Sequence, residues 1–471
     1  MEDYAHLLAL CQVKEPEDGT LLDFLIWVRV KFSVYFYILI HFCCNLEIIL
    51  SLKALKGFKD ILPDEVGLWQ FIEGKARDIF HRYGFEEIKV PILEKTDLFV
   101  RTIGESTDIV EKEMYTFADR NGASIAMRPE GTASVIRAYI ENGLYVRGSV
   151  QRLYTIGPMF RHERPQKGRL RQFHQMSVEV LGSDRAMIDT EVMAMAWQLL
   201  QEIGLEASLE INSLGCPDCR PSFKETLQEF INERIEHLCE DCQRRSATNP
   251  LRVLDCKSDN CQEHYTLAPS IIEHLCGVCS DHFVEVRRKL DLLGVPYAVN
   301  PSMVRGLDYY TKTAFELITT ELGAQGAIGA GGRYDGLVKQ LGGPDVPGIG
   351  FAMGIERLVM LLNQKEELES HPGMELFLVT LGDLANEKGF QLMQMLRSLG
   401  VRVMMDHEGR SMKNQMKQAN KQKARFALIL GENELENQEV ALKDMDSGEQ
   451  EIVELPSDFE SWAITIKAKI K

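Results

Sequence analysis

The stretch TIGPMFRHERPQKGRLRQFHQMSVEVLG, residues 155–182, decides the fold, because two apolar strand-like runs flank a loop rich in arginine. This pattern predicts an antiparallel hairpin. Arg161 ends the first run, where we expect its side chain to point into a cleft. Its planar guanidinium suits bidentate binding of a phosphate or carboxylate, although loop cations are commonly just solvated. In the second run Gln175, Ser177 and Glu179 share one face, which is unusual for a plain core strand.

A helix and further short strands surround the hairpin. An apolar stripe of helical spacing follows Asp64 and stops at Gly84, so we expect a helix capped by Asp64. FEEIKVPIL (residues 85–93) predicts a strand that Pro91 places at an edge or a bend. Three more strands are expected within residues 113–119, 124–129 and 313–319. Turns rather than helices separate these strands, so the pattern predicts a mainly antiparallel sheet with helices to one side, an α+β domain.

The pattern changes after a His-Pro-Gly turn at residues 371–373. Apolar strands then alternate with amphipathic helices, which predicts βαβ units with a parallel core and a separate α/β domain at residues 371–471. Residues 410–425 carry six basic and no acidic side chains. This patch suits contacts with nucleic-acid phosphates, unless it is only a solvated helix face.

Composition limits the classes of function. The 471 residues include 53 basic and 70 acidic side chains, a formal net charge of -17. Such a chain does not coat polyanions non-specifically, so a nucleic acid would have to be bound by a local patch. The 11 cysteines argue against a small disulfide scaffold in so long a chain and fit a reducing compartment.

Eight of the cysteines lie in residues 216–300, a mostly helical segment that we interpret as an inserted module. They form the pairs Cys216/Cys219, Cys239/Cys242, Cys256/Cys261 and Cys276/Cys279. The first two pairs are separated by 19 residues, which matches the spacing of a four-thiolate zinc site. Free thiols are the alternative, so a structural zinc is a hypothesis at this point.

Residues 1–52 stand apart as an N-terminal extension. The longest run here without Asp, Glu, Lys or Arg, residues 32–46, has 15 residues, whereas a membrane-spanning helix needs about 20. The preceding residues are acidic, unlike those of a signal peptide. A poorly ordered or over-long extension, an extra packed helix and a membrane anchor are the alternatives, in that order, and we expect no membrane partner.

Four further segments place polar side chains near predicted element ends. In RPEGT (residues 128–132) Glu130 precedes a helix that Thr132 would cap. Residues 304–317 begin VRGLDYY, ahead of a strand, and residues 327–338 (AIGAGGRYDGLV) are glycine-rich, which permits close approach to a ligand without matching a phosphate loop. In residues 347–362 Arg357 lies among apolar helix residues and needs an anionic partner if it is buried.

Together these segments resemble the class II aminoacyl-tRNA synthetases, and closely the histidyl-tRNA synthetase family of bacteria, over residues 53–471. Residues 84–99, 160–175 and 348–358 are similar to the three class motifs, the first of which forms the dimer interface. RGLDYY and GAGGRYDGL resemble two segments peculiar to the histidine enzymes. Several long motifs in one order are far more specific than any single motif.

The resemblance implies an α+β class II fold. An antiparallel catalytic sheet is expected in residues 53–215 and 301–370, an inserted helical domain in residues 216–300, and an α/β anticodon-binding domain in residues 371–471. It also implies ligation of L-histidine to tRNA(His) through histidyl-adenylate, with ATP and Mg2+ as the substrate complex. A cytoplasmic homodimer is expected.

The matched motifs imply roles for individual residues. Arg161 is expected to bind the α-phosphate and the histidine carboxylate, and Arg305 to stabilise charge at the α-phosphate; these two are the expected catalytic residues. The expected ATP site comprises Arg161, Arg169, Phe173 and Arg357, with adenine between the last two. The expected histidine site comprises Glu130, Gly131, Thr132, Arg161, Gln175, Glu179, Arg305, Tyr309 and Tyr310. In that site Glu179 and Tyr310 are expected to read the imidazole nitrogens, and Tyr309 and Tyr334 to shape the pocket. No catalytic metal ligand is expected.

Two alternative functions stay open on the sequence. The regulatory subunit of ATP phosphoribosyltransferase shares the catalytic fold, but it typically lacks the C-terminal domain and several of the pocket residues that this chain has. A class II synthetase for threonine, proline or glycine is the other alternative. RGLDYY and the absence of an editing insertion favour histidine over it.

Overall fold

The computed structural model describes Thr20, Arg29 and residues 52–105, 107–148, 150–166, 168–256, 258–321, 326–365 and 373–470. The predictions for the N-terminal extension therefore lie almost wholly outside the described residues. The chain forms two compact units, whose main segments are Trp69–Glu366 and Glu367–Lys471. No helix among the described residues has the length and apolar character needed to cross a bilayer.

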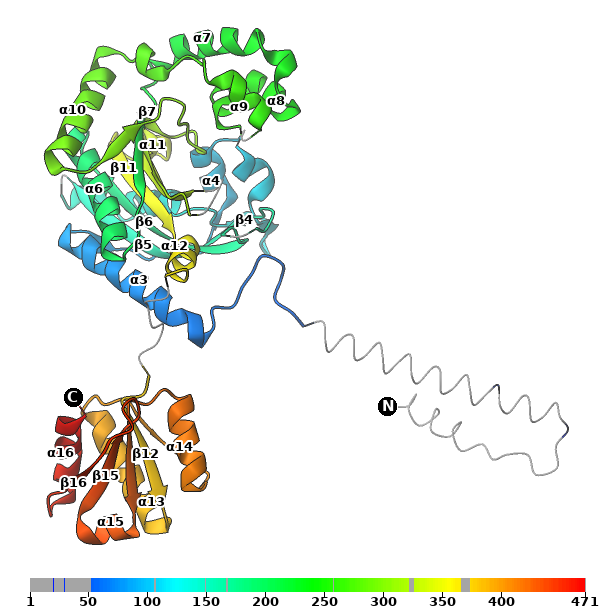
Figure 1. The fold of residues 1–471 in the computed structure, drawn as a ribbon. Coiled ribbons are helices and arrows are strands. Elements are labelled where there is room, and N and C mark those ends of the chain that lie inside the picture. Colours follow the sequence, from blue (N-terminus) through cyan, green and yellow to red (C-terminus); the bar gives the residue numbers. More distant parts are fainter. Residues whose placement is uncertain are drawn as a thin grey trace. The chain divides into compact units, whose positions relative to one another are not determined.

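An eight-stranded sheet is the centre of the first unit (Figure 1). Its strands, in spatial order, are β1 (Glu86–Glu87), β5 (Gln151–Phe160), β6 (Gln172–Leu181), β11 (Gly348–Gly354), β10 (Ala327–Arg333), β9 (Thr311–Ile318), β7 (Ser208–Ser213) and β8 (Tyr297–Val299). The inner pairs are antiparallel and the two edge pairs are parallel. The predicted hairpin is β5–β6, and the predicted antiparallel α+β fold is confirmed.

Helices pack on this sheet through apolar side chains. They are α3 (Pro63–Arg82), α4 (Thr96–Ile103), α5 (Thr132–Glu141), α6 (Ala186–Glu202), α11 (Leu337–Gln340) and α12 (Ile355–Leu362). The prediction that Asp64 caps α3 is wrong, because the helix begins at Pro63, whose fixed φ and missing N–H suit the first helical position. Asp64 instead lies in the first turn, where its charge complements the helix dipole. Gly84 follows the helix with a φ of +76°, as predicted.

The predicted strand at residues 85–93 is broken in the structure. β1 joins the large sheet, whereas β2 (Leu93–Lys95) joins β4 (Ser124–Met127) and β3 (Thr116–Ala118) in a three-stranded sheet. Pro91 lies between the two pieces and has no N–H to donate. The Arg128 guanidinium donates to the backbone carbonyls of Val90 and Pro158, each at 2.9 Å, and holds the bend.

The Cys-rich segment is mostly helical, as predicted, with α7 (Arg220–Asn232), α8 (Glu240–Thr248), α9 (Asp259–Tyr265) and α10 (Gly277–Leu293). The first three helices gather at one end of the unit, and α10 runs alongside α6 (Figure 1). α7 to α9 share a small apolar core that includes Phe223, Leu227 and Ile231. Short 3-10 turns connect the helices here and elsewhere in the unit: η2 (Leu144–Val146), η3 (Ile235–His237), η4 (Pro250–Asp255) and η5 (Ile271–His274), while Ile109–Glu113 forms one π-helical turn.

The second unit is an α/β domain around a five-stranded sheet of order β13 (Val403–Met405), β12 (Leu376–Leu381), β14 (Phe426–Gly431), β15 (Glu439–Asp444) and β16 (Gln450–Glu454). The predicted parallel core is β13–β12–β14. An antiparallel hairpin, β15–β16, extends it beyond the prediction. The helices are α13 (Asp383–Ser398), α14 (Met412–Lys421), α15 (Glu432–Asn437) and α16 (Trp462–Lys469).

Candidate active site

Two adjoining cavities open on one face of the eight-stranded sheet. Arg161, Gln175 and Arg305 line both of them, as do the small residues Ala330 and Ala352. The first cavity also includes Arg169, Phe173 and Arg357; the second includes Glu130, Gly131, Thr132, Tyr309 and Tyr310. All but one of the predicted site residues thus line the two cavities, and the exception, Glu179, is buried beside the second.

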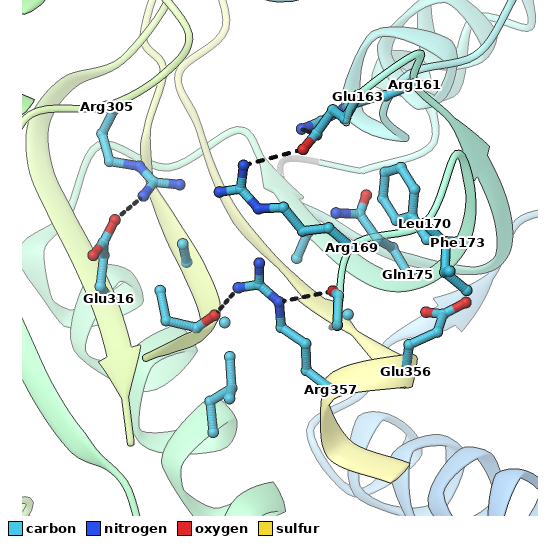
Figure 2. Close-up of a pocket in the computed structure, with 17 residues that line it drawn as sticks. Arg161, Glu163, Arg169, Leu170, Phe173, Gln175, Arg305, Glu316, Glu356 and Arg357 are labelled. Carbon is cyan, nitrogen blue, oxygen red and sulfur yellow. Dashed lines mark hydrogen bonds and ion pairs between the residues drawn. The ribbon is translucent and has the colours of Figure 1, made fainter. Parts of the chain in front are cut away.

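Arginines from separate parts of the chain converge on the first cavity. In Figure 2 the guanidinium groups of Arg169, Arg305 and Arg357 point into the same space, with Phe173 and Gln175 on the neighbouring strand. The Arg161 guanidinium lies 5.4 Å from the centre of the Phe173 ring. Such a concentration of positive charge beside an aromatic ring fits a phosphate-bearing ligand with a flat base.

Arg161 is held at the end of β5 by its neighbours. Its Nε donates to the carbonyl of Pro129 at 2.9 Å, and one terminal nitrogen lies 3.8 Å from the Glu163 carboxylate. Arg169 donates to the same carboxylate at 3.1 Å. Glu163 therefore holds two cations of the loop between β5 and β6, and the prediction that Arg161 points into a cleft is confirmed.

Arg357 is half-buried in the first turn of α12 and lines the first cavity. The sequence led us to expect an anionic partner, but its guanidinium donates to two backbone carbonyls, those of Ala327 and Gly168. Neutral partners leave the net positive charge of the side chain in the cavity. The preceding residue, Glu356, accepts from the backbone N–H of His174 at 2.8 Å and so joins α12 to β6.

Arg305 lies between the two cavities and is almost fully buried. It forms an ion pair with Glu316 of β9 at 2.5 Å, and its guanidinium lies 5.1 Å from the centre of the Tyr310 ring. Its Nε has no hydrogen-bond partner among the residues that the structure describes. A buried cation with a donor still unmatched is suited to a negatively charged ligand at the junction of the cavities.

The start of α5 forms one wall of the second cavity. Gly131 is the N-cap and Thr132 the first helical residue, so the expectation that Thr132 caps the helix is wrong. Glu130 takes that role, because its carboxylate accepts the backbone N–H groups of Thr132 at 2.6 Å and Ala133 at 2.8 Å. Burial raises the pKa of Glu130, while these hydrogen bonds oppose the shift.

The polar face of β6 forms the floor beside this wall. Glu179 is 1% exposed and accepts hydrogen bonds from the Thr132 hydroxyl at 2.7 Å and from the Tyr334 hydroxyl. Burial raises the pKa of Glu179 to about 8. Gln175 Oε1 and Ser177 Oγ are buried and have no partner among the described residues. These groups indicate a small polar ligand, since buried polar atoms are rarely left unbonded.

Small residues on the neighbouring strands make room for this polar face. Gly350, Ala352 and Gly354 of β11 stand opposite Glu179, Ser177 and Gln175. A Cβ atom at Gly350 would collide with the Glu179 carboxylate. The glycines of β11 therefore leave the space in which the carboxylate lies.

Sequence reasoning missed the acidic partners of the arginines. Glu163 lies within the arginine-rich loop, and Glu316 is a carboxylate in the apolar strand β9, which was the available signal. It also missed a fully buried ion pair between Asp189 of α6 and Arg333 of β10. Thr313 donates to the same Asp189 carboxylate at 2.6 Å. This pair ties a helix to the sheet.

The eight cysteines form two clusters, and the pairing suggested by spacing is wrong. Cys216, Cys219, Cys276 and Cys279 form one, here named the neck cluster. Cys239, Cys242, Cys256 and Cys261 form the other, the inner cluster. The first Cys-x2-Cys pair thus meets the last pair, because the chain returns to the catalytic sheet at α10, and sequence spacing alone carries no information on that return.

Comparisons with known proteins match nearly all of the described chain. The family described as histidyl-tRNA synthetase matches residues 57–358, and the family described as anticodon binding domain matches residues 375–460. A histidine–tRNA ligase of Desulfotalea psychrophila is 61% identical over 85% of this chain and 93% of its own length. Another, of Trichlorobacter lovleyi, is 55% identical over 88% of this chain and 99% of its own length.

Solved structures agree with these sequence matches. The crystal structure of apo S. aureus histidyl-tRNA synthetase has a TM-score of 0.74 and 38% identity, and covers 88% of this chain and 100% of its own. A Bacillus halodurans protein described as an ATP phosphoribosyltransferase regulatory subunit/histidyl-tRNA synthetase shares the fold, with a TM-score of 0.58 at 20% identity over 81% of this chain and 98% of its own. The high identity to the ligases does not favour the regulatory-subunit alternative. The chain belongs to the histidyl-tRNA synthetase family.

Proposed function

We propose that this chain is a histidine–tRNA ligase, which forms histidyl-adenylate from L-histidine and MgATP and then transfers the histidyl group to the 3′ end of tRNA(His). One observation carries the proposal: an arginine-lined cavity adjoins a buried pocket of tyrosine, glutamate and glutamine, and the two share Arg161, Gln175 and Arg305. A reaction that joins a phosphate to an amino acid needs such adjoining sites.

The first cavity is the proposed ATP site. Phe173 and Arg357 line it and are assigned to the two faces of adenine, where an aromatic ring and a guanidinium both stack well. Arg169 is assigned to the phosphates, since it is exposed at the edge of the cavity beside Glu163. Arg161 is assigned to the α-phosphate and the histidine carboxylate because it lines both cavities.

The chemistry needs positioning and fixed positive charge rather than a nucleophilic side chain. The histidine carboxylate attacks the α-phosphorus, pyrophosphate leaves, and negative charge gathers on the five-coordinate phosphorus. Arg305 is assigned to this charge: it lies at the junction, it is buried, and its Nε has no partner among the described residues. Donors fixed in advance in a water-poor site stabilise such charge strongly.

The second cavity is the proposed histidine pocket. Glu130, Gly131, Thr132 and Gln175 are assigned to the ammonium and carboxylate groups, while Glu179 and Tyr310 are assigned to the two imidazole nitrogens. An apolar amino acid of similar size would leave these buried groups unbonded. Sites of this kind reject such analogues by roughly 10,000-fold or more, so no editing domain is required.

The remaining partners follow from the same proposal. On α14, Lys413, Lys417 and Lys421 recur every fourth residue and are exposed, which suits contacts with tRNA phosphates. Ile92, Leu93 and Phe117 leave apolar surface exposed around the first class motif, which supports a homodimer through that region. The cytoplasm is the proposed location, because the tRNA substrate is there.

Pyrophosphate exchange into ATP, measured with each amino acid in turn, tests the function. We expect exchange that depends on histidine and not on threonine, proline or glycine. A folded protein without histidine-dependent exchange would refute the ligase and favour the regulatory-subunit alternative. Exchange with another amino acid would refute the assignment of the second cavity.

A further inference from the structure

The two cysteine clusters have the geometry of a tetrahedral metal site. In the neck cluster, Cys216 Sγ lies 3.6 Å from Cys219 Sγ and 3.9 Å from Cys276 Sγ. In the inner cluster, Cys239 Sγ lies 3.8 Å from Cys256 Sγ. Within each cluster all four sulfurs lie within 4.8 Å of one another. None of the eight cysteines is in a disulfide.

These distances select the kind of metal site. Four sulfurs bound to zinc at about 2.3 Å in a tetrahedron stand about 3.8 Å apart, which matches both clusters. A polynuclear iron–sulfur cluster places iron and sulfide atoms between the cysteines and so needs a wider cage. Sulfur-only tetrahedral ligation is the preference of Zn2+ among common biological divalent ions.

Backbone hydrogen bonds to sulfur are a second, independent observation. The N–H of Cys276 donates to Cys219 Sγ and the N–H of Cys239 donates to Cys261 Sγ, each at 3.2 Å. The N–H of Ser258 donates to Cys256 Sγ at 3.4 Å. Such donors stabilise the negative charge of thiolates and orient ligands around a metal. Four thiols gathered without a metal would gain little from this arrangement.

The positions of the clusters in the chain are complementary. The neck cluster joins the first turn after β7 to the start of α10, and so closes the insertion where it leaves and rejoins the catalytic unit. The inner cluster joins the start of α8 to the segment around α9, within the small core of the insertion. A core of this size commonly needs a metal to stay folded.

We propose that the insertion binds two structural zinc ions, one in the neck cluster and one in the inner cluster, each held by four cysteine thiolates. Cys-x2-Cys pairs supply three of the four ligand pairs, and Cys256/Cys261 supplies the fourth. Each zinc replaces long-range apolar packing by four metal–sulfur bonds.

The proposed zinc sites also have a consequence for the active site, which rests on the proposed function. Arg220, directly after Cys219, donates to the carbonyl of Tyr310, and Arg252 of η4 donates to the carbonyl of Gly306. Both carbonyls lie in the RGLDYY segment that holds Arg305. The zinc-folded insertion therefore positions this segment, with Arg220 and Arg252 as positioning residues.

Metal content of the full-length protein, purified without chelator, tests the sites and their pairing. We expect two zinc ions per chain. One quadruple variant replaces all four neck-cluster cysteines by serine; a second replaces Cys216, Cys219, Cys239 and Cys242. The structure predicts one zinc for the first variant and none for the second, whereas pairing by sequence spacing predicts none and one. Cys43→Ser/Cys44→Ser is the control and should keep both ions.

X-ray absorption at the zinc edge of the unmodified protein supplies a readout that does not depend on any variant folding. Four sulfur neighbours at about 2.3 Å are expected. Nitrogen or oxygen ligands, iron with sulfide, or a metal-free protein with disulfides would each overturn the proposal. These outcomes are separate from the exchange assay, so a failure of the zinc proposal would leave the ligase function untouched.

Discussion

Replacing Arg305 by alanine gives the sharpest prediction for the proposed chemistry. The side chain is 14% exposed and forms its ion pair with Glu316, so the substitution removes one fixed positive charge from a water-poor junction. Losing one such donor typically costs about 2.7–4 kcal/mol of transition-state stabilisation. We therefore expect histidine-dependent exchange to fall by about 100- to 1000-fold, mainly in kcat, because the charge is needed most when the phosphorus is five-coordinate.

The same substitution also strands the Glu316 carboxylate, which is 24% exposed, and this can lower stability. Arg305→Ala/Glu316→Ala separates the two effects, since it removes the unpaired carboxylate without restoring the cation. Its thermal unfolding should return towards the parent value while exchange stays low. Arg120→Ala, in an exposed turn, is the matched control and should leave exchange unchanged. Exchange by folded Arg305→Ala within threefold of the parent would refute the charge-stabilising role.

Three further predictions address other parts of the molecule. The pKa of Glu179 is raised to about 8 by burial, so the folded chain keeps a proton that the unfolded chain loses above about pH 4.5; urea unfolding should show the parent losing stability relative to Glu179→Gln by about 1.4 kcal/mol per pH unit between these values, and parallel pH curves would contradict this. Asp189→Asn should lower the free energy of unfolding by about 3–5 kcal/mol, because Arg333 is left buried without its carboxylate; Asp184→Asn, on the surface, is its control, and equal losses in urea unfolding would be inconsistent with the ion pair. Replacing the three exposed lysines of α14 by glutamate should raise KM for tRNA and reduce the salt dependence of tRNA binding by about 0.7–0.9 per lost phosphate contact, without changing exchange; unchanged tRNA binding would exclude this helix from the interface. These lysines are Lys413, Lys417 and Lys421.

The sequence predicted the fold class and the convergence of site residues well, because both depend on local patterns. Strand alternation in residues 155–182 identifies the β5–β6 hairpin, and the position of Arg161 at its end leads directly to the cavity. The placement of Arg305 and Arg357 beside Arg161 came from matched motifs, since nothing local to either residue specifies which strands become neighbours.

Long-range partners were not predictable in the same way. The pairing of Cys216/Cys219 with Cys276/Cys279 requires knowledge that the chain returns beside β7 after a long helical excursion. The carboxylates of Glu163 and Glu316 likewise find their arginines through the folded sheet. Cap positions failed for a local reason: at α3 a proline already fits the first helical position, and at α5 the longer Glu130 side chain reaches the N–H groups that Thr132 was expected to satisfy.

Helix α10 determines how this enzyme can be dissected experimentally. Its first turn carries Cys276 and Cys279 of the neck cluster, its body packs against α6 with His282 3.4 Å from Asp189, and it leads into β8 at the edge of the catalytic sheet. A truncation that removes residues 216–300 would therefore strip a supporting layer from the catalytic body and discard an edge strand. A clean excision must stop before Gly277 and bridge the short gap from β7, so that the shared helix stays with the half of the molecule that needs it.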